Sequence, residues 1–183
     1  KLQLFTPGPV PIEEHLRALG EKQPPYNRTE EFSEFTREIL SGLKYVFQTQ
    51  GDVALLTASG TAAMEASVLN FVDATDKVLI VNGGTFGQRW CDLCNVHSIT
   101  FDALTVPLGE DIALAQLDDL LEHGGYTAVM INAHETSTGQ LYDIQAIGKI
   151  ARKFGAFLIV DAISTICADQ FSMDDWHVDV AIL

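Results

Sequence analysis

A turn of small residues followed by an alanine-rich segment is the first place in the chain where chemistry is expected. The apolar run that ends at Leu56 predicts a strand, and Ser59, Gly60 and Thr61 then open a helical pattern. The first N–H groups of a helix lack intrahelical partners and carry partial positive charge, and a glycine lets a ligand approach the backbone closely. Ser59, Gly60 and Thr61 are therefore candidate phosphate ligands, with a capped core helix as the alternative.

Three further loops contain aromatic or polar residues directly after predicted strands. They contain Phe86, the hydroxyl groups of residues 136–138, and Asp161. With a phosphate site they suit a phosphorylated aromatic cofactor, because the ring needs a flat apolar face, a ring oxygen needs a donor, and a protonated ring nitrogen needs an anionic partner. Pyridoxal phosphate has all these groups.

The elements that position these loops alternate between strands and helices. Almost wholly apolar runs predict strands covered on both faces, at residues 77–81, 128–132 and 156–160, with weaker signals at 97–104 and from 178 onward. Helical patterns cover residues 13–19, 30–47, 88–96, 112–122 and 144–154, and Thr29 and Asp143 are expected to cap two of them. This alternation predicts an α/β fold, a three-layer sandwich with a mainly parallel sheet. Ligands of such sheets bind beyond the carboxyl ends of the strands, where the four loops lie.

Composition narrows the class of protein. The 183 residues are 47% hydrophobic, which is enough for one core without disulfides or a metal, and the net charge of −14 argues against nucleic acid or an anionic membrane as a partner. No apolar run approaches the length of a membrane span, and the first nine residues lack the core of a signal peptide, so we expect a cytoplasmic protein.

Several separate motifs, in the right order, resemble the class V family of pyridoxal-phosphate-dependent aminotransferases, within the aspartate aminotransferase fold (fold type I). They are residues 6–9 (TPGP), 45–49 (YVFQT), 59–61 (SGT) with 65–66 (EA), 82–83 (NG) with 86–89 (FGQR), 134–139 (HETSTG) and 160–162 (VDA). The resemblance spans essentially the whole chain. The most similar branch is that of the alanine–glyoxylate and serine–pyruvate aminotransferases, and 2-aminoethylphosphonate–pyruvate aminotransferase is a near relative.

The resemblance implies a role for each candidate residue. The turn 59–61 would cradle the phosphate, and Phe86 would stack on the pyridine ring, where many relatives have tryptophan, tyrosine or histidine. Thr136 would bind near the ring hydroxyl. Asp161 is the candidate catalytic residue, because a carboxylate beside the pyridinium nitrogen keeps the ring protonated and so makes it an electron sink.

The resemblance also implies a Schiff-base lysine, and none of the six lysines of the chain suits that role. By the family's spacing it lies about four residues beyond Leu183. We therefore expect residues 31–183 to be the cofactor-binding major domain, truncated before the lysine and the C-terminal small domain, and the fragment alone to be inactive. Residues 1–30 are expected to form an arm, a short helix and a loop at the interface of a homodimer, with Arg28 facing an acidic group or paired with a neighbouring glutamate.

The implied function is transfer of an amino group from a small amino acid of the alanine or serine type to a 2-oxo acid of the glyoxylate or pyruvate type. The alternatives are 2-aminoethylphosphonate–pyruvate transamination and a pyridoxal-phosphate-dependent lyase or desulfurase, against which Phe86 counts because those enzymes usually place histidine there. Outside this class, the chain is a non-catalytic α/β domain that binds a phosphorylated ligand.

Two other motifs favour structural roles. His134 and Glu135 suggest a metal site, but no second histidine follows at the spacing of the zinc-protease helix, so we expect no metal. Cys91 and Cys94 have thioredoxin-like spacing, but the first cysteine falls inside a predicted helix and not at its N-terminus, so buried thiols are expected.

Overall fold

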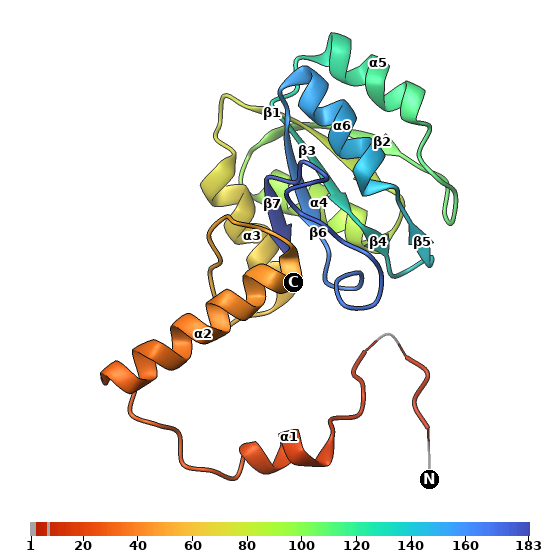
Figure 1. Cartoon of the computed structure of the whole chain (residues 1–183). Helices are drawn as coiled ribbons and strands as arrows, with labels where there is room; N and C mark the ends of the chain where they lie inside the picture. The colour runs from red at the N-terminus through yellow and green to blue at the C-terminus, as the bar shows by residue number, and fades with distance from the viewer. Residues whose placement is uncertain (1–2, 7) are drawn as a thin grey trace. The chain divides into compact units, whose positions relative to one another are not determined.

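The computed structural model of the chain describes residues 3–6 and 8–183, and it divides into two compact units, Lys1–Leu43 and Lys44–Leu183 (Figure 1). The division of the sequence into residues 1–30 and 31–183 stays a prediction. Part of the 6–9 motif lies outside the described residues, because Pro7 does. No helix in the described part of the chain is both long and apolar enough to cross a membrane.

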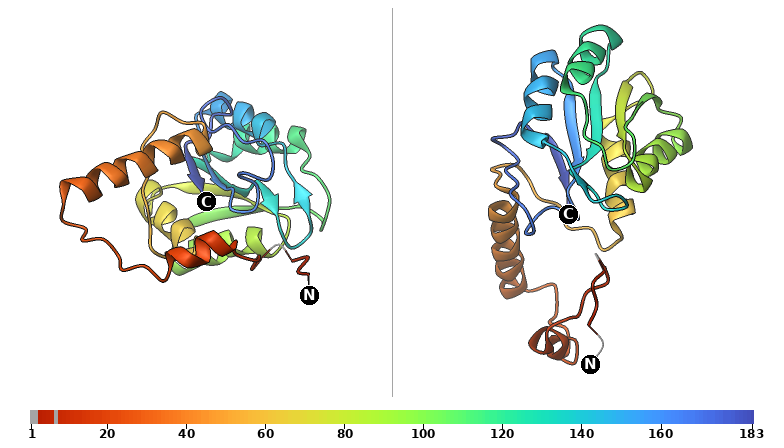
Figure 2. Two further views of the ribbon diagram at one scale, coloured as in Figure 1. Left: turned by 60° about the horizontal axis from the view of Figure 1, so that its bottom comes forward. Right: turned by 90° about the vertical axis from the view of Figure 1, so that its right-hand side faces the viewer.

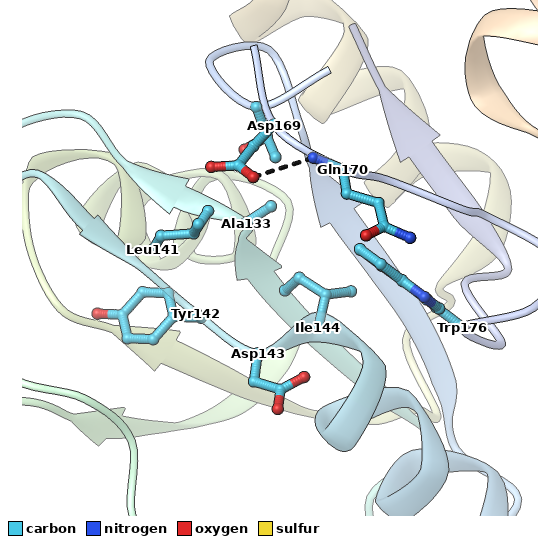
Figure 3. A pocket seen from close by; sticks show the side chains of 9 residues that line it. Ala133, Leu141, Tyr142, Asp143, Ile144, Asp169, Gln170 and Trp176 are labelled. Atoms are coloured by element: carbon cyan, nitrogen blue, oxygen red, sulfur yellow. Dashed lines mark hydrogen bonds between the residues drawn. The ribbon is translucent and has the colours of Figure 1, made fainter. Parts of the chain in front are cut away.

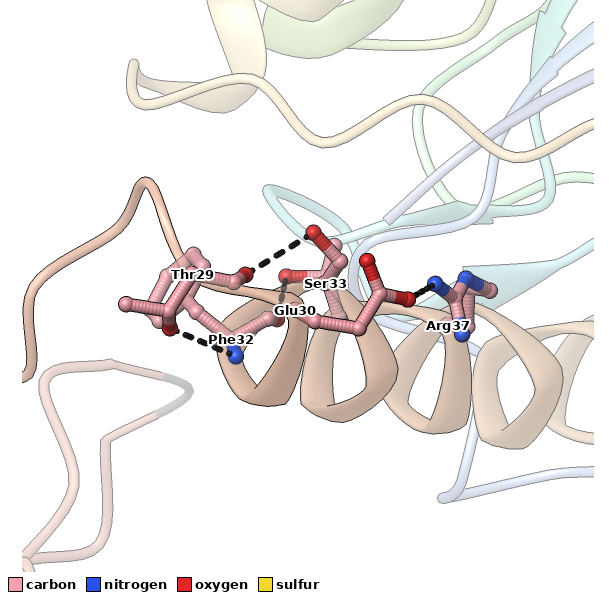
Figure 4. A network of polar contacts seen from close by, with 6 residues as sticks. Thr29, Glu30, Phe32, Ser33 and Arg37 are labelled. Atoms are coloured by element: carbon pink, nitrogen blue, oxygen red, sulfur yellow. Dashed lines mark hydrogen bonds and ion pairs between the residues drawn. The ribbon is translucent and has the colours of Figure 1, made fainter.

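The first unit contains helix α1 (Glu14–Leu19) and most of α2 (Glu30–Phe47), whose last turn belongs to the second unit. Thr29 caps α2 as expected, since its hydroxyl accepts a hydrogen bond from the Phe32 N–H at 3.2 Å (Figure 4). Glu30 forms an ion pair with Arg37, two turns along the same helix. Helix α1 has no buried residue, so its apolar side chains are open to solvent.

A five-stranded parallel sheet forms the centre of the second unit. Its order is β2-β1-β3-β6-β7, with bounds Thr100–Thr105, Lys77–Asn82, Ala128–Asn132, Phe157–Asp161 and Val180–Ile182. All five residues of β3 are buried, as expected for the central strand of a parallel sheet covered on both faces. The mainly parallel sheet predicted from the sequence is confirmed.

Helices cover both faces of this sheet (Figure 2). Helices α3 (Gly60–Phe71) and α4 (Thr85–Val96) share one core cluster with β1, in which Met64 and Trp90 pack with Val78 and Ile80. Helices α5 (Leu114–Gly124) and α6 (Ile144–Phe154) contact one another on the other face, where the alternate strand residues point. The three layers of the predicted sandwich are therefore present.

Two segments differ from their prediction. The apolar run that ends at Leu56 has no regular secondary structure, and the side chains of Leu55 and Leu56 are 57% and 54% exposed. An apolar run becomes a strand only where a neighbouring strand satisfies its backbone groups, and both edges of the sheet are formed by other strands, β2 and β7. The loop after β3 contains a short antiparallel hairpin, β4 (His134–Glu135) with β5 (Gln140–Leu141), that was not predicted.

The beginning of the second unit is tied to its end. The Thr49 hydroxyl donates to the Asp174 carboxylate at 2.5 Å, the Gln50 N–H donates to the other oxygen at 2.9 Å, and the Met173 N–H donates to the Phe47 carbonyl at 3.0 Å. We call this contact the terminal latch. It holds the chain that leads into the turn at 59–61 against the segment that precedes β7.

Candidate functional site

The candidate site lies at the carboxyl edge of the sheet, where β3 and β6 end side by side. Asn132, the last residue of β3, is in register with Asp161, the last residue of β6, and its side-chain amide donates to Asp161 Oδ2 at 2.7 Å. The Ile163 N–H donates to the other oxygen, Oδ1, at 3.1 Å. Two neighbouring strands thus fix the orientation of the carboxylate.

Asp161 is a buried acid without a cationic hydrogen-bond partner. Its residue is 6% exposed, and no lysine or arginine of the described residues forms an ion pair with it. Burial raises the pKa of Asp161, while its hydrogen bonds from Ile163 and Asn132 and the charge of Arg89 act in the opposite direction. A cationic N–H group of a ligand would supply the missing partner.

The turn at 59–61 forms the N-terminus of α3. The Ser59 hydroxyl accepts from the Ala62 N–H at 3.4 Å, a long capping bond, and Ser59 itself is exposed. A Cβ atom added to Gly60 would lie 2.1 Å from Ile163 Cδ1, so this turn lies directly against the segment that follows Asp161. The structure shows Ser59 as a helix cap, and the role of Ser59, Gly60 and Thr61 as phosphate ligands stays a prediction.

Thr136 lies in a cluster of hydroxyl and imidazole groups beside the same segment. Its Oγ1 is 2.8 Å from the Ser164 hydroxyl, which also lies 3.0 Å from His134 Nδ1 and donates to the His134 carbonyl at 3.2 Å. The His134 ring thus contacts a side chain from the neighbouring loop. Ser164 was not predicted, because a serine three positions after a strand gives no sign of what it faces.

Phe86 is half-buried in the first turn of α4. The Arg89 guanidinium lies 4.6 Å from the centroid of its ring, a cation–π contact, and the charge of Arg89 also lowers the pKa of Asp161. The Phe86 N–H donates to the carboxylate of Glu135, at 3.1 Å to Oε2.

The structure thus brings the four predicted loops together pairwise: Gly60 against Ile163, Thr136 against Ser164, and Phe86 against Glu135. Asn132, Glu135 and Ser164 are the participants that sequence reasoning missed as part of the site. Asn132 carried a usable signal, since it is the polar end of an apolar strand at the edge where ligands bind.

Cys91 and Cys94 are buried thiols, as predicted. Burial raises the pKa of Cys94 to about 12, and that of Cys91 is raised for the same main reason. Cys94 Sγ lies 4.0 Å from Met130 Sδ in the core under α4. Neither thiol has the electropositive surroundings of a redox-active cysteine.

A separate pocket of about 140 Å³ opens beside the N-terminus of α6 (Figure 3). It is lined by Tyr142, Asp143 and Trp176 among others, and by Thr165, whose buried hydroxyl has no hydrogen-bond partner among the described residues. None of the predicted site residues lines this pocket, although Ala133 and Thr165 come from the loops that follow β3 and β6.

Comparisons with known proteins agree with this arrangement. The chain is 36% identical over 98% of its length to the small subunit of a soluble hydrogenase from Synechococcus sp., and 33% identical over 98% to an L-aspartate–glyoxylate aminotransferase from Paracoccus denitrificans. The crystal structure of an alanine–glyoxylate aminotransferase from Nostoc sp. superposes with a TM-score of 0.91 at 31% identity, over 96% of this chain and 47% of that one.

The chain spans about half the length of the curated relatives that it matches, 48% of the Synechococcus protein and 47% of the Paracoccus protein. Residues 16–183 match the family described as Aminotransferase class-V. With its parallel sheet and the loops gathered at the carboxyl edge, the chain belongs to the class-V aminotransferase family.

Proposed function

We propose that the full-length protein transfers an amino group from a small amino acid to a 2-oxo acid of the glyoxylate type. The observation that carries the proposal is Asp161, a buried carboxylate at the carboxyl edge of the sheet with no ion-pair partner among the described residues. Membership of the class-V family implies pyridoxal phosphate as the cofactor.

The residues at this edge fit that cofactor. Asp161 is anionic when deprotonated, is held by two neighbouring groups, and can accept from a protonated ring nitrogen. The N-terminus of α3 offers free N–H groups to a phosphate, and at Gly60 a Cβ atom would fill the space next to Ile163. The hydroxyl pair of Thr136 and Ser164 supplies donors for a ring oxygen.

When bound, pyridoxal phosphate supplies the electron sink that lets an amino acid lose its α-proton. The work of this chain is then to bind and orient. Asp161 would keep a proton on the ring nitrogen, since a neighbouring carboxylate favours the charged form. Phe86 would cover one face of the ring and restrict water there, and the turn at 59–61 would hold the phosphate.

A lysine that takes up the α-proton must come from outside residues 44–183. In this unit Lys77 pairs with Asp102, Lys153 pairs with Asp118, and the Lys44 ammonium group donates to the Gln50 carbonyl. Lys149 is exposed on α6, on the face of the sheet opposite α3 and α4. By the spacing of the class-V family, we propose that the Schiff-base lysine follows residue 183 in the full-length protein.

Glyoxylate is the proposed acceptor because several similar proteins are named for it. They include the Paracoccus protein, the Nostoc structure and a serine–glyoxylate aminotransferase from Arabidopsis thaliana that is 33% identical over 98% of this chain. Alanine, serine and aspartate are the donors that these names suggest, and Phe86 at the stacking position favours transamination over a lyase or desulfurase reaction.

The test is an amino-transfer assay on the full-length protein with pyridoxal phosphate, pairing each of the three donors with glyoxylate and measuring glycine by chromatography. Glycine formation that Asp161→Ala abolishes, while the variant stays folded by circular dichroism, supports the proposal. Asp92→Ala is the control, because Asp92 is exposed on α4 and bonds only Gln88 among the described residues. No glycine from any donor with the wild-type protein, or normal turnover by Asp161→Ala, would refute it.

We further propose a cytoplasmic homodimer in which residues 1–30 contribute to the subunit interface. Phe5, Ile12, Leu16 and Tyr26 are 88%, 62%, 49% and 66% exposed, and a partner subunit would cover these apolar side chains. Arg28 is proposed to face an acidic substrate group. Of the two neighbouring glutamates that could pair with it instead, Glu30 is already paired with Arg37, and Glu31 stays the alternative.

This part of the proposal predicts a dimer by light scattering. It also predicts a raised KM for aspartate, with little change for alanine, in Arg28→Ala. A monomer would contradict the interface, and an unchanged KM for aspartate would contradict the role of Arg28.

A further inference from the structure

Glu135 is a buried acid to which the proposed function assigns no role. Its residue is 1% exposed, and its carboxylate accepts hydrogen bonds from the Phe86 N–H at 3.1 Å, the Gly87 N–H at 2.9 Å, the Ser137 N–H at 3.2 Å and the Ser137 hydroxyl at 2.5 Å. The Ser137 hydroxyl in turn accepts from the Thr85 N–H at 3.0 Å. We call these five hydrogen bonds the Glu135 clamp.

The clamp replaces the missing cap of α4. The residue before this helix is Gly84, which has no side chain to accept from the first N–H groups. Glu135, from a hairpin 48 or 49 residues further along the chain, accepts two of them, and Ser137 accepts a third. A carboxylate is favourable there because the N-terminus of a helix carries partial positive charge.

The clamp is closely packed. A Cβ atom added to Gly84 would lie 2.4 Å from Ser137 Oγ and 2.7 Å from both Cγ and Cδ of Glu135. Any side chain at position 84 would therefore displace the carboxylate from the helix. The hairpin therefore packs directly against the first turn of α4, with no room for a side chain at position 84.

Both ends of the clamp carry a residue of the proposed cofactor site. Phe86 is itself one of the donors, and Thr136 lies between Glu135 and Ser137 in the chain, with its hydroxyl directed to Ser164. We propose that Glu135 is a positioning residue for the cofactor, which sets the Phe86 ring and the Thr136 hydroxyl at a fixed separation across the ring-binding space. This inference rests on the proposed function and adds a specific residue to it.

A positioning role and a purely stabilising role differ in what they predict for the bound cofactor. If Glu135 only caps α4, its loss lowers the unfolding temperature and leaves the cofactor of the folded protein unchanged. If it positions Phe86 and Thr136, its loss also weakens cofactor binding and changes the asymmetric surroundings of the ring, which visible circular dichroism reports.

The experiment uses the full-length protein with pyridoxal phosphate as the probe. For the wild type, Glu135→Gln, Ser137→Ala and the control Asp143→Ala, we would measure the cofactor dissociation constant, the visible circular dichroism at saturation and the unfolding temperature without cofactor. Asp143 is a matched control, because it caps α6 through a hydrogen bond from the Ala146 N–H at 2.9 Å but takes part in none of the five hydrogen bonds of the Glu135 clamp.

Glu135→Gln keeps the shape of the side chain but replaces one of the two acceptor oxygens by a donor. We expect a dissociation constant at least about tenfold higher and a reduced visible signal. Ser137→Ala removes two of the five hydrogen bonds and should raise the constant about threefold. Asp143→Ala should lower the unfolding temperature without affecting the other two measurements.

An unchanged dissociation constant and visible signal in Glu135→Gln would overturn the inference, even if the variant is less stable. If Glu135→Gln does not fold, Ser137→Ala decides, and wild-type values for that variant would overturn the inference equally. Failure of the wild-type protein to take up pyridoxal phosphate would instead refute the proposed function, and the inference with it.

Discussion

Replacing Asp161 by asparagine should make the cofactor-free protein more stable while it weakens cofactor binding. The change is isosteric, and Asn132 can adapt to it. The buried Asn132 Oδ1 has no hydrogen-bond partner within residues 3–6 and 8–183, so rotation of this amide lets it accept from the new side chain. The bond from the Ile163 N–H is kept as well. The variant therefore removes a buried negative charge without losing hydrogen bonds.

The magnitude follows from burial. Asp161 is 6% exposed and its pKa is raised mainly by burial, so the native state disfavours the charged form. Removing this charge should increase the free energy of unfolding by about 1 kcal/mol at pH 7. For a domain of this size that corresponds to roughly 2–4 °C in unfolding temperature.

The pH dependence provides a second check. A carboxyl group with a raised native pKa causes no penalty below its unfolded pKa of about 3.9. The penalty grows as the pH rises from that value to the native pKa, and it stays constant above the native pKa. The advantage of Asp161→Asn should thus be largest at pH 7–8 and decrease toward pH 4. With saturating pyridoxal phosphate the order should reverse, because the carboxylate then has a cationic partner.

The assay is thermal unfolding of the cofactor-free full-length protein between pH 4 and pH 8, at constant salt. Asp179→Asn is the control: Asp179 accepts from the Leu158 N–H at 2.8 Å but is itself exposed, so its replacement should not stabilise the protein. A destabilised Asp161→Asn at pH 7, or a stabilisation that does not change with pH, would refute the reasoning.

Two further predictions concern the phosphate turn and the cysteines. Gly60→Val should weaken pyridoxal phosphate binding more than tenfold. It should lower the unfolding temperature only slightly, because the nearest atom to a new Cβ is the end of the flexible Ile163 side chain. Unchanged affinity in equilibrium dialysis would mean that the anion site lies elsewhere. Thiol labelling of the native protein, mapped by mass spectrometry, should modify the exposed Cys167 rapidly. The buried Cys91 and Cys94 should be modified at least about a hundredfold more slowly. Rapid labelling of Cys94 would contradict its assignment as a buried thiol.

Local periodicity and composition were enough to predict most of the fold. Helix α2 was predicted with its observed bounds, because an apolar stripe at helical spacing and a capping Thr29 coincide there. The run ending at Leu56 was mistaken for a strand, because hydrophobicity indicates only that a segment seeks burial and does not identify the partner. Its leucines are half exposed in the described chain.

A site residue could be predicted only where its own position in the sequence, such as the end of an apolar strand, indicated a role. Asp161 was found because it ends an apolar strand. The role of Glu135 could not be predicted, because the groups that donate to it are backbone N–H groups of a helix about 49 residues earlier. The sequence does not reveal such donors, because nearly every residue type has a backbone N–H group. Ser164 acquires its role in the same way, from side chains 28 and 30 residues away.

The terminal latch has a consequence for how the protein is made. Thr49 and Asp174 are 125 positions apart, and at a synthesis rate of about 5–20 residues per second the ribosome needs roughly 6–25 s to add the second after the first. During this interval residues 47–50 cannot contact residues 173–174, although the ribosome has already synthesised the residues of α3 and β1. The nascent protein can therefore complete the terminal latch only late in its synthesis, after most of the second unit already exists as chain.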